Sequence, residues 1–220
     1  MVSVIGWGWE ELIELLRRTN RLSEFGVLWH CPKVSFDVSW DDPELFARQF
    51  AIWTTTYALA PGERLPIQGH EQFRIERYRR PDRLLSLHSR VVTEEGCRFF
   101  LMLDLLAPHD LLGRVMTYLG ALLRTGGVRG GGFVIRTSRS FHFIGRECVD
   151  AALYRKVLDL VLKSGGGNGI VDVGYCAHTL ARELETGLRL QPAMPEERLE
   201  VVAELPEMPS EPIARRDGSH

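Results

Sequence analysis

The spacing of apolar residues changes along the chain and divides it into expected helices and strands. A helical repeat predicts helices over residues 9–25, 41–59, 111–123 and 148–164. Shorter apolar or alternating runs predict strands over residues 27–31, 34–40, 70–79, 83–92, 98–104, 133–139, 169–175 and 199–205. Tight turns between residues 70 and 104 favour an antiparallel meander. The pattern therefore predicts an α+β fold with a central mixed or antiparallel sheet flanked by helices.

Composition restricts the class of protein but does not identify a partner. The chain has 220 residues, of which 45% are hydrophobic and 25% charged, with a formal net charge of -2. These values are typical of a globular protein with a sizeable core. A nucleic-acid partner would therefore require a local concentration of basic residues. Five arginines at 74, 77, 79, 80 and 83 are a candidate for such a strip, and a solvated sheet face is the alternative.

Motifs concentrate in the middle of the chain. We expect residues 1–62 to form an N-terminal helical and strand part of the same domain, 63–192 to form its core, and 193–220 to be a tail rich in proline and glutamate. Four cysteines without a CxxC pair, no secretory signal and no long apolar run predict a cytoplasmic protein that does not enter a membrane. No zinc is expected, because the Cys and His spacings do not suit a zinc site.

Asp104 is the strongest single candidate for chemistry. It closes the apolar run RFFLMLD, so its carboxylate is expected at the end of a buried strand. Burial of a charged carboxylate is unfavourable unless a metal ion or hydrogen bonds compensate. A turn or helix-capping aspartate is the alternative.

A second candidate group follows the glycine-rich segment TGGVRGGG. Ser138, Arg139, Ser140 and His142 lie within five residues and supply two hydroxyls, a guanidinium and an imidazole, which together can bind phosphate. A core histidine is the alternative for His142. The glycine segment could bring backbone N–H groups to an anion near these residues, although it lacks the GK[ST] of a P-loop. Asp172, in IVDVGY, is again an acid at the end of an apolar run.

The order of these motifs resembles the archaeo-eukaryotic primase superfamily, which includes the primase-polymerases. In that family an acidic D-x-D or D-x-E motif is followed by S-x-H and then by a hydrophobic residue and Asp. The corresponding segments are Asp104-Leu105-Leu106, Ser140-Phe141-His142 and Val171-Asp172. The resemblance covers roughly residues 74–192 and implies an RRM-like catalytic core.

The resemblance also implies roles for individual residues. Asp104 and Asp172 would hold Mg²⁺ or Mn²⁺, and they would act with His142 as catalytic residues. Ser138, Arg139, Ser140, His142 and Arg189 would bind the nucleoside triphosphate. One position departs from the family pattern, because Leu106 stands where the second acid of the first motif is expected, and a leucine cannot ligate a metal. Asp110 would be a replacement, and His109 a weaker one because magnesium prefers oxygen ligands.

Two hypotheses for function follow from the resemblance. The first is a primase- or polymerase-like nucleotidyltransferase that acts on DNA or RNA with nucleoside triphosphates and a divalent metal. The second is a catalytically degenerate module that binds nucleic acid or nucleotide, with a possible protein partner in a replication, repair or defence complex. An unrelated α+β domain remains a third possibility, and it predicts that Asp104, His142 and Asp172 lie on different faces.

Overall fold

The computed structural model describes residues 3–30, 63–80, 84–190 and 198–207, and the expected elements at 34–40 and 41–59 lie outside these ranges. The described helices are α1 (Trp9–Thr19), α3 (Ile75–Tyr78), η2 (His109–Leu111), α4 (Leu112–Gly126), α5 (Ala151–Lys163), α6 (Gly165–Gly169) and α7 (Val173–Ala181). The described strands are β1 (Leu22–His30), β2 (Glu63–Gln68), β3 (Leu84–His88), β4 (Arg90–Thr93), β5 (Gly96–Leu105), β6 (Gly132–Arg136), β7 (Phe141–Val149), β8 (Gly187–Arg189) and β9 (Glu200–Leu205).

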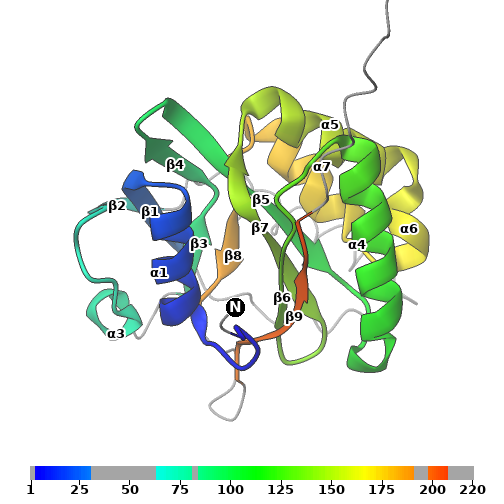
Figure 1. The fold of residues 1–220 in the computed structure, drawn as a ribbon, viewed down its shortest axis with the longest axis horizontal. Coiled ribbons are helices and arrows are strands. Elements are labelled where there is room, and N and C mark those ends of the chain that lie inside the picture. The colour runs from blue at the N-terminus through cyan, green and yellow to red at the C-terminus, as the bar shows by residue number, and fades with distance from the viewer. Residues whose placement is uncertain (1–2, 31–62, 81–83, 191–197, 208–220) are drawn as a thin grey trace, which may run out of the picture.

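The described strands form one nine-stranded sheet in which every strand pairing is antiparallel, and this confirms the expected α+β fold. The strand order is β8-β3-β1-β4-β5-β7-β6-β9, and β2 pairs with the other edge of β1. Helix α1 lies against one face, and α4, α5 and α7 lie against the other (Figure 1). The strands at both ends of the chain, β1 and β9, belong to this sheet.

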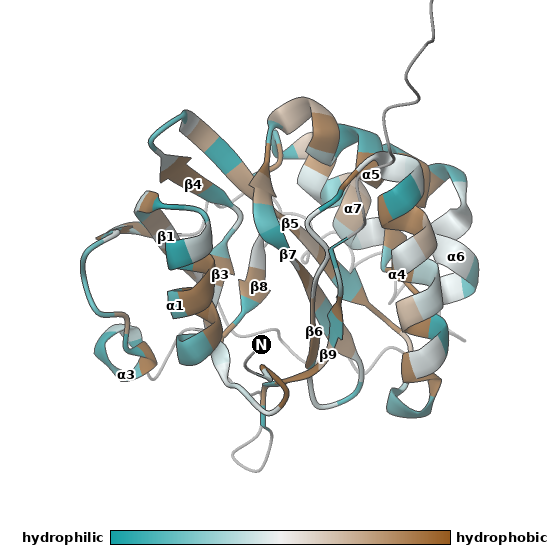
Figure 2. Ribbon diagram, viewed as in Figure 1, coloured by the Kyte–Doolittle hydropathy of each residue, from teal (hydrophilic) through white to brown (hydrophobic). Residues whose placement is uncertain are grey.

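Two hydrophobic cores lie on opposite faces of the sheet because residues of a strand alternate between its faces. On β5, Phe100 and Met102 pack with α1, whereas Leu101, Leu103 and Leu105 pack with α4 and α5. The strand is therefore apolar on both sides, as its unbroken hydrophobic run predicts. Figure 2 shows the same property for the half of β7 that begins at Phe141, where hydrophobic colouring dominates.

Several boundaries differ from those that the sequence predicts. Helix α1 ends at Thr19, since residues from Leu22 onward enter strand β1 and pair with three other strands. Sheet hydrogen bonds there outweigh the helical spacing of the apolar residues. The strand expected at 70–79 is wrong, because this segment forms the short helix α3. Within the described residues, no helix is both long and apolar enough to cross a membrane.

Candidate nucleotide-binding rim of the sheet

Asp104 and His142 lie opposite each other on the neighbouring strands β5 and β7. The His142 Nε2 atom is 3.6 Å from the Asp104 Oδ1 atom, and the two side chains are 8% and 28% exposed. Alternation along β5 directs Asp104 to the face that also carries Phe100 and Met102, which is the face covered by α1. The strand-end acid and the histidine therefore lie on one rim of the sheet through direct cross-strand pairing.

Asp172 lies along the edge of β5 opposite to the one that pairs with β7. Its backbone N–H donates to the carbonyl of Asp104 at 2.9 Å, and Val171 forms a single antiparallel bridge with Leu105. The expected strand at 169–175 is thus reduced to one bridge, and Asp172 becomes the N-cap of α7. Its Oδ1 atom accepts a hydrogen bond from the Tyr175 N–H at 3.1 Å. An N-cap aspartate satisfies a helix N–H that would otherwise lack a partner.

The two carboxylates also affect the thiol of Cys176, which is buried in the core formed with α4 and α5. Burial raises the pKa of Cys176 to about 12, and the negative charges of Asp172 and Asp104 contribute in the same direction. The thiol therefore remains protonated near neutral pH.

The sheet divides into two branches, a fork, and the segment that leads from α7 to β8 lies at this division. β3 and β4 are consecutive along β1, but β3 pairs with β8 whereas β4 pairs with β5. Ser89 lies at the division and is fully buried. Its Oγ atom donates to the Leu184 carbonyl at 2.7 Å and accepts from the Thr186 N–H at 3.0 Å. These bonds hold the return from α7 to β8 inside the fork.

Tyr175 of α7 links the two faces of the sheet. Its ring packs against both hydrophobic cores, and burial raises the pKa of its phenol well above the ordinary value. A neutral phenol is compatible with this position beside Asp104, whereas a phenolate would be repelled. In the sequence, this tyrosine is only one residue of a weak apolar run. No local pattern therefore predicts that Tyr175 contacts both cores.

Ser138, Arg139 and Ser140 lie in the turn that joins β6 to β7, immediately before His142. The Thr137 N–H donates to the Ser140 carbonyl at 3.0 Å, and the Ser140 N–H donates to Thr137 Oγ1 at 3.2 Å. Ser138 and Arg139 are exposed at the tip of the turn. The four candidate phosphate-binding residues are therefore adjacent in space as well as in sequence.

His109 fixes this turn to the segment that follows Asp104. Its Nε2 atom lies 2.9 Å from the Thr137 carbonyl and 3.2 Å from the Ser140 carbonyl, so this nitrogen carries the proton and donates. The ring also packs on Phe141, with 5.2 Å between ring centroids. His109 thus holds the turn in place. Sequence reasoning considered it only as a weak metal ligand.

Arg189 is on the same sheet but is not brought to Asp104 and His142. It lies on β8 opposite Ser86, and its neighbours Leu188 and Leu190 belong to the core under α1. Strand alternation therefore directs the Arg189 side chain to the opposite face. On that face, burial lowers the pKa of His88 to about 4, which leaves its imidazole neutral within the structure.

The glycine-rich segment is not near the candidate site, contrary to the sequence expectation. Gly132 pairs with Gly145, whereas His142 pairs with Ile135 at the other end of β6. Gly131 has a positive φ of 64°, and a Cβ atom there would collide with the carbonyl oxygens of Leu205 and Pro206. The glycines thus allow α4 to turn into β6 against β9.

The predicted basic strip also has a different setting. Arg74 precedes helix α3, and its Nη1 atom is 2.7 Å from Glu10 Oε2 of α1. Its partner is therefore a carboxylate of the same chain. Arg83, the last arginine of the group, lies outside the described residues.

The donor set of the rim suits one hard divalent cation better than two. Asp104 and Asp172 supply carboxylate oxygens, which Mg²⁺ and Mn²⁺ prefer. One Asp172 oxygen caps α7, and Leu106, at the position of the expected second acid, is 55% exposed. Over the described ranges, no group of three or more His, Cys, Asp or Glu side chains is arranged to hold a metal ion. Water or a bound phosphate would have to complete the coordination of a cation.

The order of these residues is matched by a family profile described as "AEP-like: Archaeo-eukaryotic primase 1D-like" over residues 70–197, more than half of the chain. The chain belongs to this family. The matched range includes the primase-like segments with Asp104, His142 and Asp172, and it begins after β2 and ends before β9. No curated protein and no solved structure gives a significant match. Together with the convergence of the three motifs on one rim, the family match excludes an unrelated α+β domain.

Proposed function

We propose that this primase-like chain is a nucleotidyltransferase domain that adds nucleotides from nucleoside triphosphates to a DNA or RNA strand. The observation that supports it is the convergence of Asp104, His142 and Asp172 on one rim through a cross-strand pair and a backbone hydrogen bond. These three residues come from segments that are far apart in sequence. They belong to the three segments that carry the family resemblance, and these segments follow one another in the order that the family has.

Asp104 and Asp172 are the residues that would hold Mg²⁺ or Mn²⁺. Such an ion, when bound, supplies charge neutralisation for the transferring phosphate. Asp104 is anchored at the end of a buried strand, and Asp172 is oriented by its N-cap bond to Tyr175. Both carboxylates are thus positioned before a ligand arrives, which lowers the cost of ordering them.

The β6–β7 turn and His142 would bind the triphosphate. Arg139 is the exposed cation of the turn, and Ser138 and Ser140 add hydroxyl groups. A guanidinium and hydroxyl donors match the geometry of phosphate oxygens. Arg189 is left out of this proposal because its side chain is directed to the opposite face of the sheet.

A second candidate function is favoured by Leu106. An exposed leucine replaces the second acid of the first motif, so two carboxylates remain where the family has three. This observation favours a degenerate module that binds nucleotide or nucleic acid without catalysis, as part of a replication, repair or defence complex. The two candidates differ in whether a bond is formed between nucleotides.

Primer extension with Mn²⁺ and with Mg²⁺ separates the candidates. We expect the wild-type protein to extend a labelled primer on a template, and Asp104→Asn to reduce the rate by about 100-fold or more, since it removes a charged metal ligand. Asp159→Asn, at an exposed aspartate of α5, is the matched control and should leave the rate unchanged. Nucleotide binding without extension would favour the degenerate module.

A further inference from the structure

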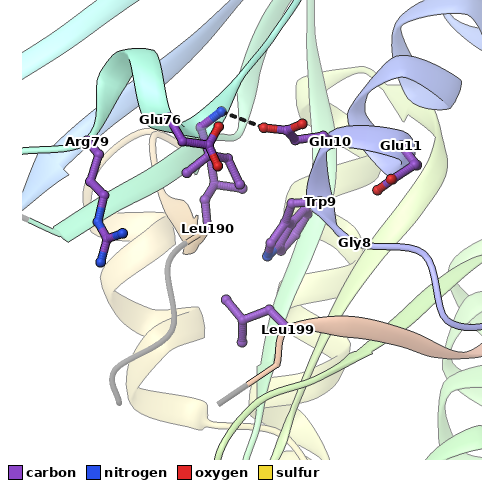
Figure 3. Close-up of a pocket in the computed structure, with 9 residues that line it drawn as sticks. Gly8, Trp9, Glu10, Glu11, Glu76, Arg79, Leu190 and Leu199 are labelled. Atoms are coloured by element: carbon purple, nitrogen blue, oxygen red, sulfur yellow. Dashed lines mark hydrogen bonds between the residues drawn. The ribbon is translucent and has the colours of Figure 1, made fainter. Parts of the chain in front are cut away.

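A cavity of about 300 Å³ opens between the first turn of α1, helix α3 and the facing ends of β8 and β9 (Figure 3). It is lined by Gly8, Trp9, Glu10, Glu11, Ile75, Glu76, Arg79, Leu190 and Leu199. The lining does not include Asp104, His142 or Asp172. The cavity therefore needs its own explanation.

Trp9 carries a polar group that is buried in this cavity without a partner. The residue is 3% exposed, and its indole N–H has no hydrogen-bond partner among the residues that the structure describes. Figure 3 shows the indole nitrogen directed toward the space between Arg79, Leu190 and Leu199. A buried donor left unsatisfied costs about 1–3 kcal/mol. A ligand with a hydrogen-bond acceptor at this point would recover that energy.

The charges around the cavity restrict what that ligand is. Glu10 accepts hydrogen bonds from Arg74 and from the Ile75 N–H, which lower its pKa in opposition to the effect of burial. Glu11, Glu76 and Arg79 are exposed at the mouth. The mouth therefore carries more carboxylates than guanidinium groups, and this disfavours a phosphate group inside it.

The walls favour a flat apolar body with polar edges. Leu190 and Leu199 are buried and supply apolar surface, while the Trp9 N–H supplies a donor and the carboxylates of Glu11 and Glu76 supply acceptors. A nucleobase has apolar faces, ring or carbonyl acceptors, and amino or imino donors. It matches each of these surfaces and carries no charge itself.

The cavity lies on the same rim and face of the sheet as Asp104. Val201 of β9 exchanges hydrogen bonds with Gly6 and Trp7, just before α1, and it pairs with Ile135 of β6. Ile135 pairs with His142, which pairs with Asp104. One row of paired residues thus leads from the first turn of α1 to the catalytic candidates. Both sites are on the face covered by α1.

We infer that this cavity binds one unpaired nucleobase, and this inference rests on the proposed function in nucleic-acid chemistry. The base inserts with its edge toward the Trp9 N–H, its faces against Leu190 and Leu199, and its phosphates outside the acidic mouth. Such a pocket would hold a single-stranded template or an incoming nucleotide beside the rim. A base from either source would present the same chemistry to the cavity.

Binding of oligonucleotides with and without bases tests the inference. The four homopolymeric 12-mers are titrated, and the tightest one is compared with the same strand carrying abasic positions. We expect wild type to bind the abasic strand about tenfold more weakly, since it loses the hydrogen bond and apolar contacts. Trp9→Phe keeps an aromatic ring but loses the pyrrole part of the indole with its N–H donor, so it should bind the intact strand about fivefold more weakly and discriminate less against abasic positions. The corresponding nucleoside triphosphate, titrated separately, distinguishes a template base from an incoming one.

Two controls keep the test decisive. Trp7→Phe changes a half-buried tryptophan that does not line the cavity and should bind as wild type. Arg79→Ala changes an exposed residue of the mouth, so it carries the test if Trp9→Phe lowers the melting temperature. We expect Arg79→Ala to weaken binding of the intact strand more than binding of the abasic strand, because Arg79 also lines the cavity that receives the base.

The outcomes separate this inference from the proposed function. If strands bind, but Trp9→Phe and Arg79→Ala have the same affinities for intact and abasic strands as wild type, the base pocket is wrong. The proposed function then stands. Equal weakening of both strands would also overturn the pocket, because the loss would then be independent of the base. If neither strands nor triphosphates bind, both proposals fail.

Discussion

Single hydrogen bonds position the residues of the candidate site. His109 is the clearest example, since one ring nitrogen donates to the carbonyls at both ends of the β6–β7 turn. It follows β5 in sequence, so it connects the strand of Asp104 to the turn that carries Arg139. The orientation of the phosphate-binding candidates therefore depends on a residue outside all three motifs.

Replacement of His109 tests this dependence. His109→Ala removes both bonds, so we expect triphosphate affinity to fall about three- to tenfold through loss of turn order. His109→Gln can restore one donor and should recover part of the affinity. Isothermal titration with a nucleoside triphosphate measures both, and a melting curve reports stability separately. A fall in melting temperature with unchanged affinity would show that His109 supports the fold alone.

At the residue scale the sequence predicts the identity of the main candidates but not their environment. An apolar run and a polar cluster indicate Asp104 and His142, and the structure pairs them. The role of Asp172 as an N-cap and the packing of Tyr175 against both cores depend on contacts between segments that are distant in sequence. The fork is created by pairing between distant segments, and local periodicity carries no information about it.

At the scale of elements, long amphipathic runs are predicted well and short mixed segments poorly. Helix α5 begins after its N-cap Asp150, and α4 and β5 lie close to the expected ranges. Residues 70–79 alternate like a strand but form α3, which packs on α1 through Glu10. Here a tertiary contact outweighs a local preference.

The glycine segment before β6 supports a prediction at this scale. Gly131→Ala places a methyl group against the carbonyls of Leu205 and Pro206 at a positive φ, so we expect a loss of about 2–4 kcal/mol in the free energy of unfolding. Gly113→Ala, in α4, meets no atom within 4 Å and should be neutral or stabilising by up to about 1 kcal/mol. Denaturant unfolding measures both. Equal effects would contradict the packing role of Gly131.

At the scale of the whole molecule, one continuous sheet brings distant motifs to a single rim. The family match covers residues 70–197, yet β1, β2 and β9 complete the same sheet from outside that range. Helix α1, also outside it, covers the face to which Asp104 is directed. The architecture of the site thus depends on more of the chain than its three motifs.

The exposed Leu106 offers a gain-of-function prediction for this rim. The Leu106 backbone N–H donates to the Ile170 carbonyl. The next bond along β5 runs from the Asp172 N–H to the Asp104 carbonyl, so positions 106 and 172 are close along the chain pairing. Leu106→Asp would add a third carboxylate, and we expect Mn²⁺ affinity to rise about tenfold or more. Leu106→Asn, of similar size without the charge, is the control. Manganese titration that finds equal affinity in all three proteins would show that position 106 does not face the cation.

The most direct test of the central claim is titration of a nucleoside triphosphate with and without Mn²⁺, on wild type and on Asp104→Asn. If Asp104, Asp172 and His142 form a metal-assisted nucleotide site, Mn²⁺ will tighten binding by about tenfold or more in wild type and will have little effect in Asp104→Asn. Equal binding by both proteins, with or without the metal, would contradict the assignment of this rim as the nucleotide site.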